Sequence, residues 1–122
     1  EEKSDELLTQ GLKALNDLWE EDGMNLFARN PHELMRALEV LNIMTNAEIV
    51  IQSSIARKAS CKQLHFMRSD YKKLDPPEWH KFVIVSKNSE GVHVSELPID
   101  YYSPMDENYE KYNQEYIKEN SA

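Results

Sequence analysis

The feature that most constrains this chain is a long stretch without a helix breaker, residues 34–55, which follows a strong helix start. Asn30 suits an N-cap, Pro31 occupies the first helical position, where its missing N–H is not needed, and Glu33 is placed to complete a capping box. Nothing interrupts this helix before about Ala59, so the predicted length is on the order of 40 Å. A fold that contains such a helix has to be organised around it.

The apolar side chains of this stretch are spread around most of the predicted helix. They are Leu34, Leu38, Val40, Leu41, Ile43, Met44, Ala47, Val50, Ile51 and Ile55. A helix with this distribution is expected to be contacted on several sides. We therefore predict that Leu38 and Leu41 are core positions, where truncation to alanine costs roughly 2–5 kcal/mol.

An amphipathic helix is predicted upstream, from Ser4 to about Gly23. Ser4 is a suitable N-cap, and the acidic residues Asp5 and Glu6 suit the positive end of the helix dipole. The apolar residues share one arc of the helix: Leu7, Leu8, Leu12, Leu15, Leu18 and Trp19. One side of this helix is therefore expected to pack, with Gly23 bending or ending it.

After the helices, residues 60–79 predict an ordered loop that closes at Asp75-Pro76-Pro77. Residues 80–99 predict a β-hairpin, because two β-branched segments flank turn chemistry at residues 88–91. A lone hairpin is marginal in water, so this one should pack on the helices or on another part of the protein.

The acidic tail, residues 100–122, has tyrosines at helical spacing: Tyr109, Tyr112 and Tyr116. This spacing permits one short C-terminal helix. The predicted fold is therefore mainly α, a helical bundle of two principal helices with a β-hairpin and this short helix. At 122 residues the chain is expected to form a single domain.

The composition argues against several classes of function. A formal net charge of -8 opposes non-specific nucleic-acid binding, and no apolar run is long enough for direct membrane insertion. The three glycines are far apart, so no glycine-rich loop is present to bind FAD or another nucleotide. Cys61 and His65 are the only close pair of metal-ligand types, too few for a metal site or a catalytic dyad with an orienting partner. We expect no catalytic, cofactor-binding or metal site in these residues.

One basic patch interrupts the acidic sequence. It comprises Arg57, Lys58, Lys62, Arg68, Lys72 and Lys73. Two interpretations stay open, a solvated face or a surface that meets an acidic partner.

A set of motifs between His32 and Trp79 resembles a known family. The motifs are His32-Glu33-Leu34-Met35-Arg36-Ala37-Leu38-Glu39, Thr45-Asn46-Ala47-Glu48, Ala56-Arg57-Lys58, and Arg68-Ser69-Asp70-Tyr71 followed by Asp75 and Trp79. Together they resemble the C-terminal helical domain of the fumarate reductase/succinate dehydrogenase flavoprotein family. The loop length between Ser60 and Arg68 is most similar to the adenylylsulfate reductase α-subunit branch.

Individual positions carry this resemblance. Ser60 matches a Ser/Thr position of the family, Arg68, Asp70 and Tyr71 match an Arg-x-Asp-Tyr/Phe block, and Trp79 matches the following tryptophan. Ala59 and Cys61 depart from the pattern, because the family has Glu and Arg there.

The resemblance implies a parent chain in which FAD-binding and capping domains precede Glu1 and carry out hydride transfer. This chain would then be a scaffold and interface domain, inactive alone, packing on those domains and near an iron–sulphur subunit in the cytoplasm or at the cytoplasmic side of a membrane. The implied interface residues are Arg57, Ser60, Arg68, Asp70, Tyr71 and Trp79. The alternative hypothesis is a free-standing helical protein-interaction module.

For the loop itself, we predict that Arg68 and Asp70 point to opposite faces of an extended segment. Trp79 is predicted to anchor the loop by burying its ring.

Overall fold

The computed structural model describes residues 2–99 and 104–120. Its elements are β1 (Glu2–Lys3), α1 (Asp5–Glu21), a short 3₁₀ helix (Gly23–Asn25), α2 (Pro31–Ala56), β2 (Met67–Arg68), a second 3₁₀ helix (Pro77–Trp79), β3 (Lys81–Asn88), β4 (Gly91–Pro98) and α3 (Met105–Asn120). The prediction of a mainly α fold with a β-hairpin is confirmed.

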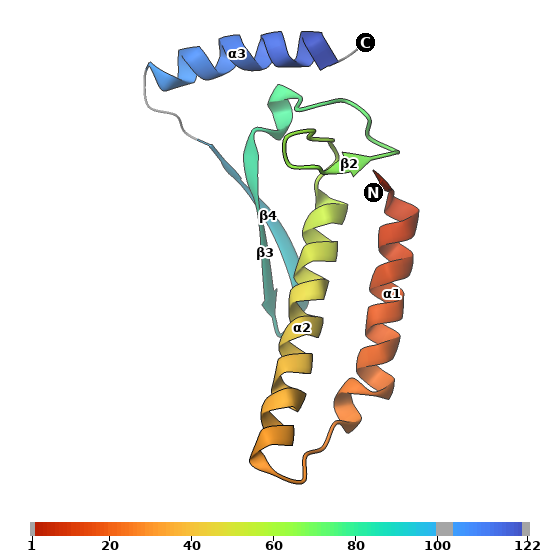
Figure 1. Cartoon of the computed structure of the whole chain (residues 1–122). Helices are drawn as coiled ribbons and strands as arrows, with labels where there is room; N and C mark the ends of the chain where they lie inside the picture. Colours follow the sequence, from red (N-terminus) through yellow and green to blue (C-terminus); the bar gives the residue numbers. More distant parts are fainter. Residues whose placement is uncertain (1, 100–103, 121–122) are drawn as a thin grey trace.

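The helices α1 and α2 form a long antiparallel pair (Figure 1). Two glycines lie at this interface, Gly11 in α1 and Gly23 in the 3₁₀ helix that follows it. A Cβ at Gly11 would lie 4.0 Å from Ile51, and one at Gly23 would lie 3.6 Å from Met44. Met44 lies at this interface and is only 6% exposed.

Local sequence signals set both helix starts. The Ser4 side chain accepts a hydrogen bond from the Leu7 amide, and that of Asn30 accepts one from the Glu33 amide at 3.0 Å. Glu33 reaches back to the amide of Arg29 at 2.8 Å, so the reciprocal cap forms one residue earlier than expected. The helix α2 ends at Ala56 rather than at about Ala59, because the backbone is already extended at Arg57.

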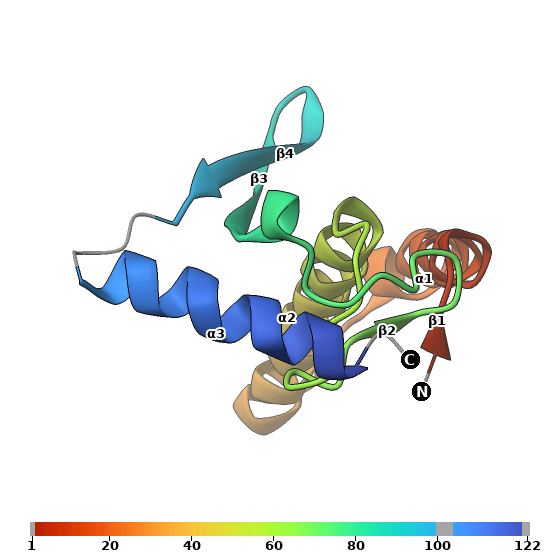
Figure 2. The ribbon, with the colours of Figure 1, turned by 90° about the horizontal axis from the view of Figure 1, so that it is seen from above.

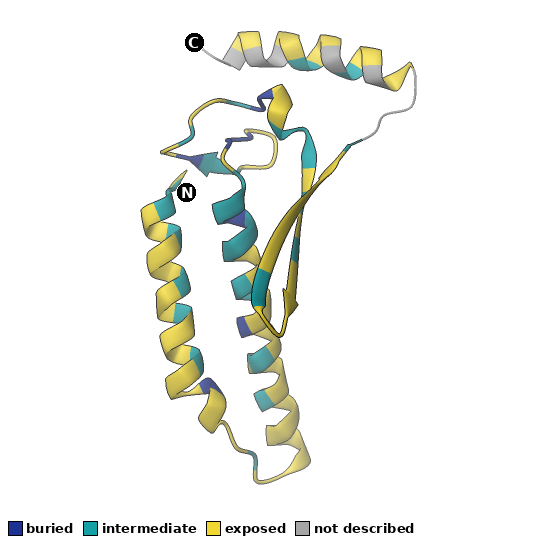
Figure 3. Cartoon of the chain, turned by 180° about the vertical axis from the view of Figure 1, so that it is seen from behind, coloured by how far each residue is buried: buried dark blue, intermediate teal, exposed yellow. Residues whose placement is uncertain are grey.

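The β-hairpin lies behind α2 and on one side of it (Figures 1 and 3). Its strands pair from Lys81 opposite Pro98 to Asn88 opposite Gly91. The strands include both ends of the predicted turn at residues 88–91, which leaves Ser89 and Glu90 as the turn. A second, very small sheet was not predicted: β1 pairs in parallel with β2 and joins the start of the chain to the loop.

The prediction that Leu38 is a core position is wrong for this chain, because 52% of its surface is exposed. The tip of the hairpin reaches only the middle of α2, where Lys87 pairs with Glu48 at 2.9 Å, and Glu48 lies ten residues after Leu38. Leu41 is half-buried. The helix α2 is apolar around most of its surface, but the rest of the chain covers only part of it (Figure 3).

The helix α3 crosses the end of the molecule where α2 stops (Figures 1 and 2). It is longer than the short helix predicted, and it includes Tyr109 and Tyr112. Within the described ranges, no helix combines the length and apolarity that crossing a bilayer requires.

Candidate functional site

Arg68 is the centre of a polar network where the two long helices meet the loop. Its side chain is 0% exposed. Nε and Nη2 donate to the two carboxylate oxygens of Asp70, at 2.8 and 2.7 Å, in a bidentate pair. Nη1 donates to the carbonyls of Ser54 and Arg57, at 2.6 and 3.2 Å, and Nη2 also donates to the carboxylate of Asp5.

These contacts use every N–H group of the guanidinium, which has five. None is left to donate to a ligand. The prediction that Arg68 and Asp70 point to opposite faces is therefore wrong. The strand β2 ends at Arg68 and the chain bends at Ser69, so the two side chains turn toward each other.

The network is built from helix ends. The last carbonyls of α2 lack helical partners, and a cation is favoured at this negative end of the helix dipole. Asp5 lies at the opposite kind of end, the first turn of α1, and its own amide donates to Asp70 at 2.8 Å. Arg68 and Asp70 therefore join the start of α1 to the end of α2. We call Asp5, Arg68 and Asp70, together with Ser60, the Arg68 clamp.

Ser60 holds the loop that carries the clamp. Its side chain is fully buried, accepts from the Arg68 amide at 2.9 Å and donates to the Tyr71 carbonyl at 2.7 Å. Its backbone carbonyl accepts from the Asp75 amide at 2.9 Å. The hydroxyl thus satisfies two backbone groups that no strand partner serves.

Replacing Ser60 with alanine is expected to lower the free energy of unfolding by about 1–3 kcal/mol, because the Arg68 amide and the Tyr71 carbonyl lose a partner in a buried position. Urea unfolding followed by circular dichroism measures the loss. Ser69→Ala is the matched control, since Ser69 is exposed and its hydroxyl makes one 3.3 Å bond to the Lys3 carbonyl. Equal effects at the two positions would contradict the assignment.

Asp70 gives the clamp a pH dependence. The hydrogen bonds from Arg68 hold the pKa of this carboxyl well below its ordinary value of 3.8. Because the folded-state pKa is depressed, the stabilisation is complete above about pH 4 and declines as the pH falls below the ordinary value. The difference in unfolding free energy between the natural chain and Asp70→Asn should be constant from pH 5 to 7 and shrink between about pH 4 and 2. A difference that does not change with pH would show that the carboxylate charge is not what stabilises the loop.

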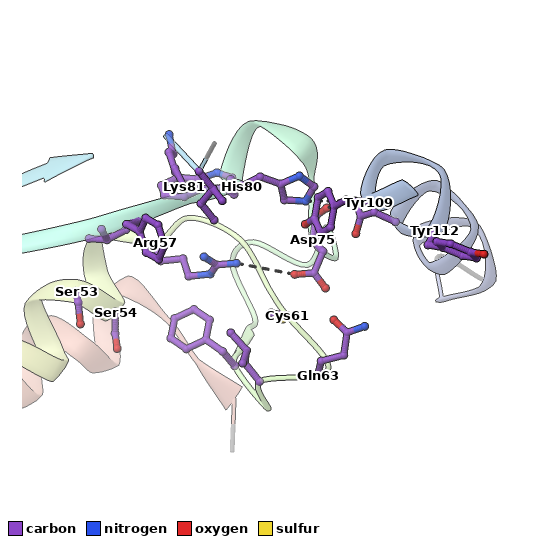
Figure 4. A pocket seen from close by; sticks show the side chains of 17 residues that line it. Ser53, Ser54, Arg57, Cys61, Gln63, Asp75, His80, Lys81, Tyr109 and Tyr112 are labelled. Atoms are coloured by element: carbon purple, nitrogen blue, oxygen red, sulfur yellow. Dashed lines mark hydrogen bonds and ion pairs between the residues drawn. The ribbon is translucent and has the colours of Figure 1, made fainter. Parts of the chain in front are cut away.

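A pocket of about 760 Å³ lies next to the clamp, between the end of α2, the loop, the start of β3 and α3 (Figure 4). Arg57 and Asp75 face each other in it, with Nη2 and Oδ1 3.9 Å apart. Arg57 Nε and Asp75 Oδ2 are buried without a hydrogen-bond partner. Asp75 also has a positive φ of 39°, in the left-handed region, so its backbone is strained.

The helix α3 closes one side of this pocket. The ring of Tyr109 meets that of His80 edge to face, with centroids 4.8 Å apart. Asn113 Nδ2 lies 3.4 Å from the Asp75 carbonyl and 3.2 Å from His80 Nε2. The described contacts of α3 with this region thus include one aromatic pair and the polar contacts of Asn113.

Cys61 lines the pocket but is not activated. Burial, and then its hydrogen bond to the Asp75 side chain, raise the pKa of this thiol. It is therefore protonated at neutral pH and a poor nucleophile. His65 is exposed, and among the described residues no three metal-ligand side chains gather into a group that could hold a metal.

The six residues implied by the sequence divide into two sets. Ser60, Arg68, Asp70 and Tyr71 come together in one place, the Tyr71 ring 5.0 Å below the guanidinium, and Arg57 adds its carbonyl. Trp79 lies apart, half-buried rather than enclosed, with the Lys81 ammonium 4.3 Å from its ring centre.

Sequence reasoning missed Asp5 as a member of the clamp and the Ser54 carbonyl as an acceptor for Arg68. Asp5 was explained as a favourable charge at a helix start, and 63 residues separate it from Arg68, so no spacing relates them. The basic patch is also smaller than predicted, because Arg68 is buried and Lys73 pairs with Glu78 at 3.2 Å.

Comparison with known proteins gives one family. Residues 2–116 match the family model described as the fumarate reductase flavoprotein C-terminal domain. A comparison with curated proteins gives no match. Since the family model accounts for all of the elements from β1 to most of α3, this chain belongs to the family of fumarate reductase flavoprotein C-terminal domains.

Proposed function

We propose that this chain is the scaffold and interface domain of an FAD-dependent oxidoreductase and has no catalytic activity alone. The observation that carries the proposal is the large surface of the chain. It exposes 9280 Å², whereas a compact monomer of 14.3 kDa exposes about 6,800 Å². The excess, on the order of 2,500 Å², is more than a standard protein–protein interface buries.

Large apolar side chains contribute to the exposed surface. Across the described ranges the fully packed core is limited to Met44, Ala59, Cys61 and Pro76. Many larger side chains are exposed on the helices, among them Leu7, Leu18, Leu34, Leu38, Ile43 and Val50. A monomer rarely leaves so many large apolar side chains in water, which favours a permanent neighbour.

The described residues form neither a glycine-rich loop nor an uncapped helix start that could bind FAD, so we propose that the cofactor binds to other domains of the parent. Gly11 lies within α1, Gly23 in a 3₁₀ helix and Gly91 in the hairpin, so none forms a loop that could hold a pyrophosphate. The first amides of α1 and α2 are capped by Ser4 and Asn30. Binding and hydride transfer are then functions of the FAD-binding and capping domains.

The role proposed for Arg57, Ser60, Arg68, Asp70 and Tyr71 is indirect. They fix the angle between α1, α2 and the loop. They thereby determine the shape of the surface that contacts the other domains of the parent chain. Trp79, which is half-buried, is proposed to contact a neighbour directly.

Finer assignments are also proposals. The distance in sequence between Ser60 and Arg68 favours a parent similar to the adenylylsulfate reductase α-subunit. An iron–sulphur subunit would then be a further partner, and the cytoplasm the compartment.

The test compares the intact gene product with residues 1–122 purified alone. The intact protein should carry stoichiometric flavin absorbance, and residues 1–122 should be colourless and unable to reduce fumarate or adenylylsulfate with a dye as electron donor. Two results would contradict the proposal: flavin bound to residues 1–122, or an intact gene product that consists of this chain alone and binds no flavin. The second outcome would favour the free-standing interaction module.

A further inference from the structure

Arg57 and Asp75 face each other in the pocket beside the Arg68 clamp, but they do not satisfy each other (Figure 4). Nη2 of Arg57 and Oδ1 of Asp75 are 3.9 Å apart, which is too far for a hydrogen bond. Only 10% of the Asp75 side chain and 21% of the Arg57 side chain are exposed, and Arg57 Nε and Asp75 Oδ2 are buried without a partner. Buried polar groups without a partner are rare in folded proteins and destabilising.

The two arginines of this region differ in how they are used. All five N–H groups of Arg68 donate to the chain, whereas among the described contacts the side chain of Arg57 donates no hydrogen bond. The Arg57 backbone is nevertheless held in place, because its amide donates to the Ser53 carbonyl and its carbonyl accepts from Arg68. The amide of Asp75 donates to the Ser60 carbonyl at 2.9 Å. The chain therefore fixes both backbones and leaves the guanidinium of Arg57 available.

The walls of the pocket are largely apolar. They include Phe66, Trp79, Phe82, Val83, Ile99 and Tyr109. Lys81 also lines the pocket, but its ammonium is already paired with Glu96 at 2.7 Å. The volume of about 760 Å³ is typical of a small-molecule site. The pocket thus combines one positive and one negative group, side by side, with an apolar wall.

We infer that this pocket binds the zwitterion of an apolar α-amino acid. The carboxylate of the ligand pairs with Nη2 of Arg57, its ammonium pairs with Oδ1 of Asp75, and its side chain lies against the apolar wall. The four charged groups then alternate in sign around a quadrilateral, so each neighbouring pair attracts. The 3.9 Å between Nη2 and Oδ1 suits this arrangement, because the carboxylate and the ammonium of an α-amino acid are attached to the same carbon.

Other classes of small molecule fit this pocket less well. A simple anion would pair with Arg57 but would lie beside the carboxylate of Asp75, and a simple cation would be repelled by Arg57 in the same way. A purely apolar ligand would cover both charges without pairing either of them. An amino acid with a charged side chain would place a third charge against the apolar wall, which is also unfavourable.

Isothermal titration calorimetry of the intact gene product tests this inference, with L-phenylalanine as the probe. L-Phenylalanine should bind. Two analogues that each lack one charge, 3-phenylpropanoate and 2-phenylethylamine, should bind at least about tenfold more weakly, because a hydrogen bond between charged groups is lost. L-Aspartate should also bind at least about tenfold more weakly, since its second carboxylate would meet the apolar wall.

Two substitutions connect this binding to the pocket. Arg57→Gln and Asp75→Asn should each weaken the binding of L-phenylalanine at least about tenfold. Arg36→Gln is the matched control, because Arg36 is an exposed arginine of α2 that pairs with Glu39 and does not line the pocket. It should leave the affinity unchanged. Circular dichroism shows whether each variant is folded, and the analogues test the same two charges without any substitution.

Three results would overturn the inference. The first is a failure of L-phenylalanine to bind to the intact gene product. The second is equal affinity for L-phenylalanine and for either analogue that lacks a charge. The third is undiminished binding of L-phenylalanine to a folded Arg57→Gln variant. None of these results depends on flavin, so the proposed function is tested separately.

Discussion

Replacing Arg68 with alanine is expected to lower the free energy of unfolding of this chain by about 3 kcal/mol. Removing one partner of a buried ion pair costs roughly 3–5 kcal/mol, because the remaining charge is left without compensation. The lower end applies here, since the carboxylates of Asp5 and Asp70 keep 48% and 28% exposure and can be partly hydrated. The carbonyls at the end of α2 lose their donor as well.

Urea unfolding followed by circular dichroism measures this loss. Arg36→Ala is the matched control, because Arg36 pairs with Glu39 at 2.7 Å on the exposed surface of α2, where such a pair contributes about 0.5 kcal/mol or less. Arg68→Lys should recover little of the stability, since an ammonium keeps the charge but cannot make the bidentate pair and reach both carbonyls. If Arg68→Ala and Arg36→Ala unfolded at the same urea concentration, the clamp would not be a main determinant of the stability of the fold.

Truncating Met44 to alanine is expected to lower the free energy of unfolding by about 2–5 kcal/mol. Met44 is 6% exposed and fills the space beside Gly23, where the ring of Trp19 also packs. Its removal leaves a cavity in the small core that α1 and α2 share. Thermal or urea unfolding of residues 1–122 gives the value.

Leu38→Ala is the matched control, because it also shortens a large apolar side chain of α2. Here the expected loss is about 1 kcal/mol or less, since half of the Leu38 surface is already in water. In the intact parent, a larger loss at Leu38 would indicate that a neighbour covers it. Equal losses for Met44 and Leu38 in residues 1–122 would contradict the packing described for α2.

The sequence by itself determined the local elements of this protein. The caps at Ser4 and Asn30 bond to amides only three residues away, so they are visible in sequence. The helix α2 follows from its lack of breakers, and the hairpin follows from β-branched segments around a turn. The family resemblance rested on motifs that are contiguous in the same way, and the family itself is confirmed.

Only the tertiary structure decided how these elements meet. The contact of Arg68 with Asp5 and the pairing of β1 with β2 join residues more than 60 positions apart, and no periodicity encodes such a distance. Nor did the apolar pattern of α2 distinguish Met44 from Leu38. Hydrophobicity states that a side chain favours burial, but whether it is covered depends on which neighbours reach it, and in this chain they reach only part of the helix.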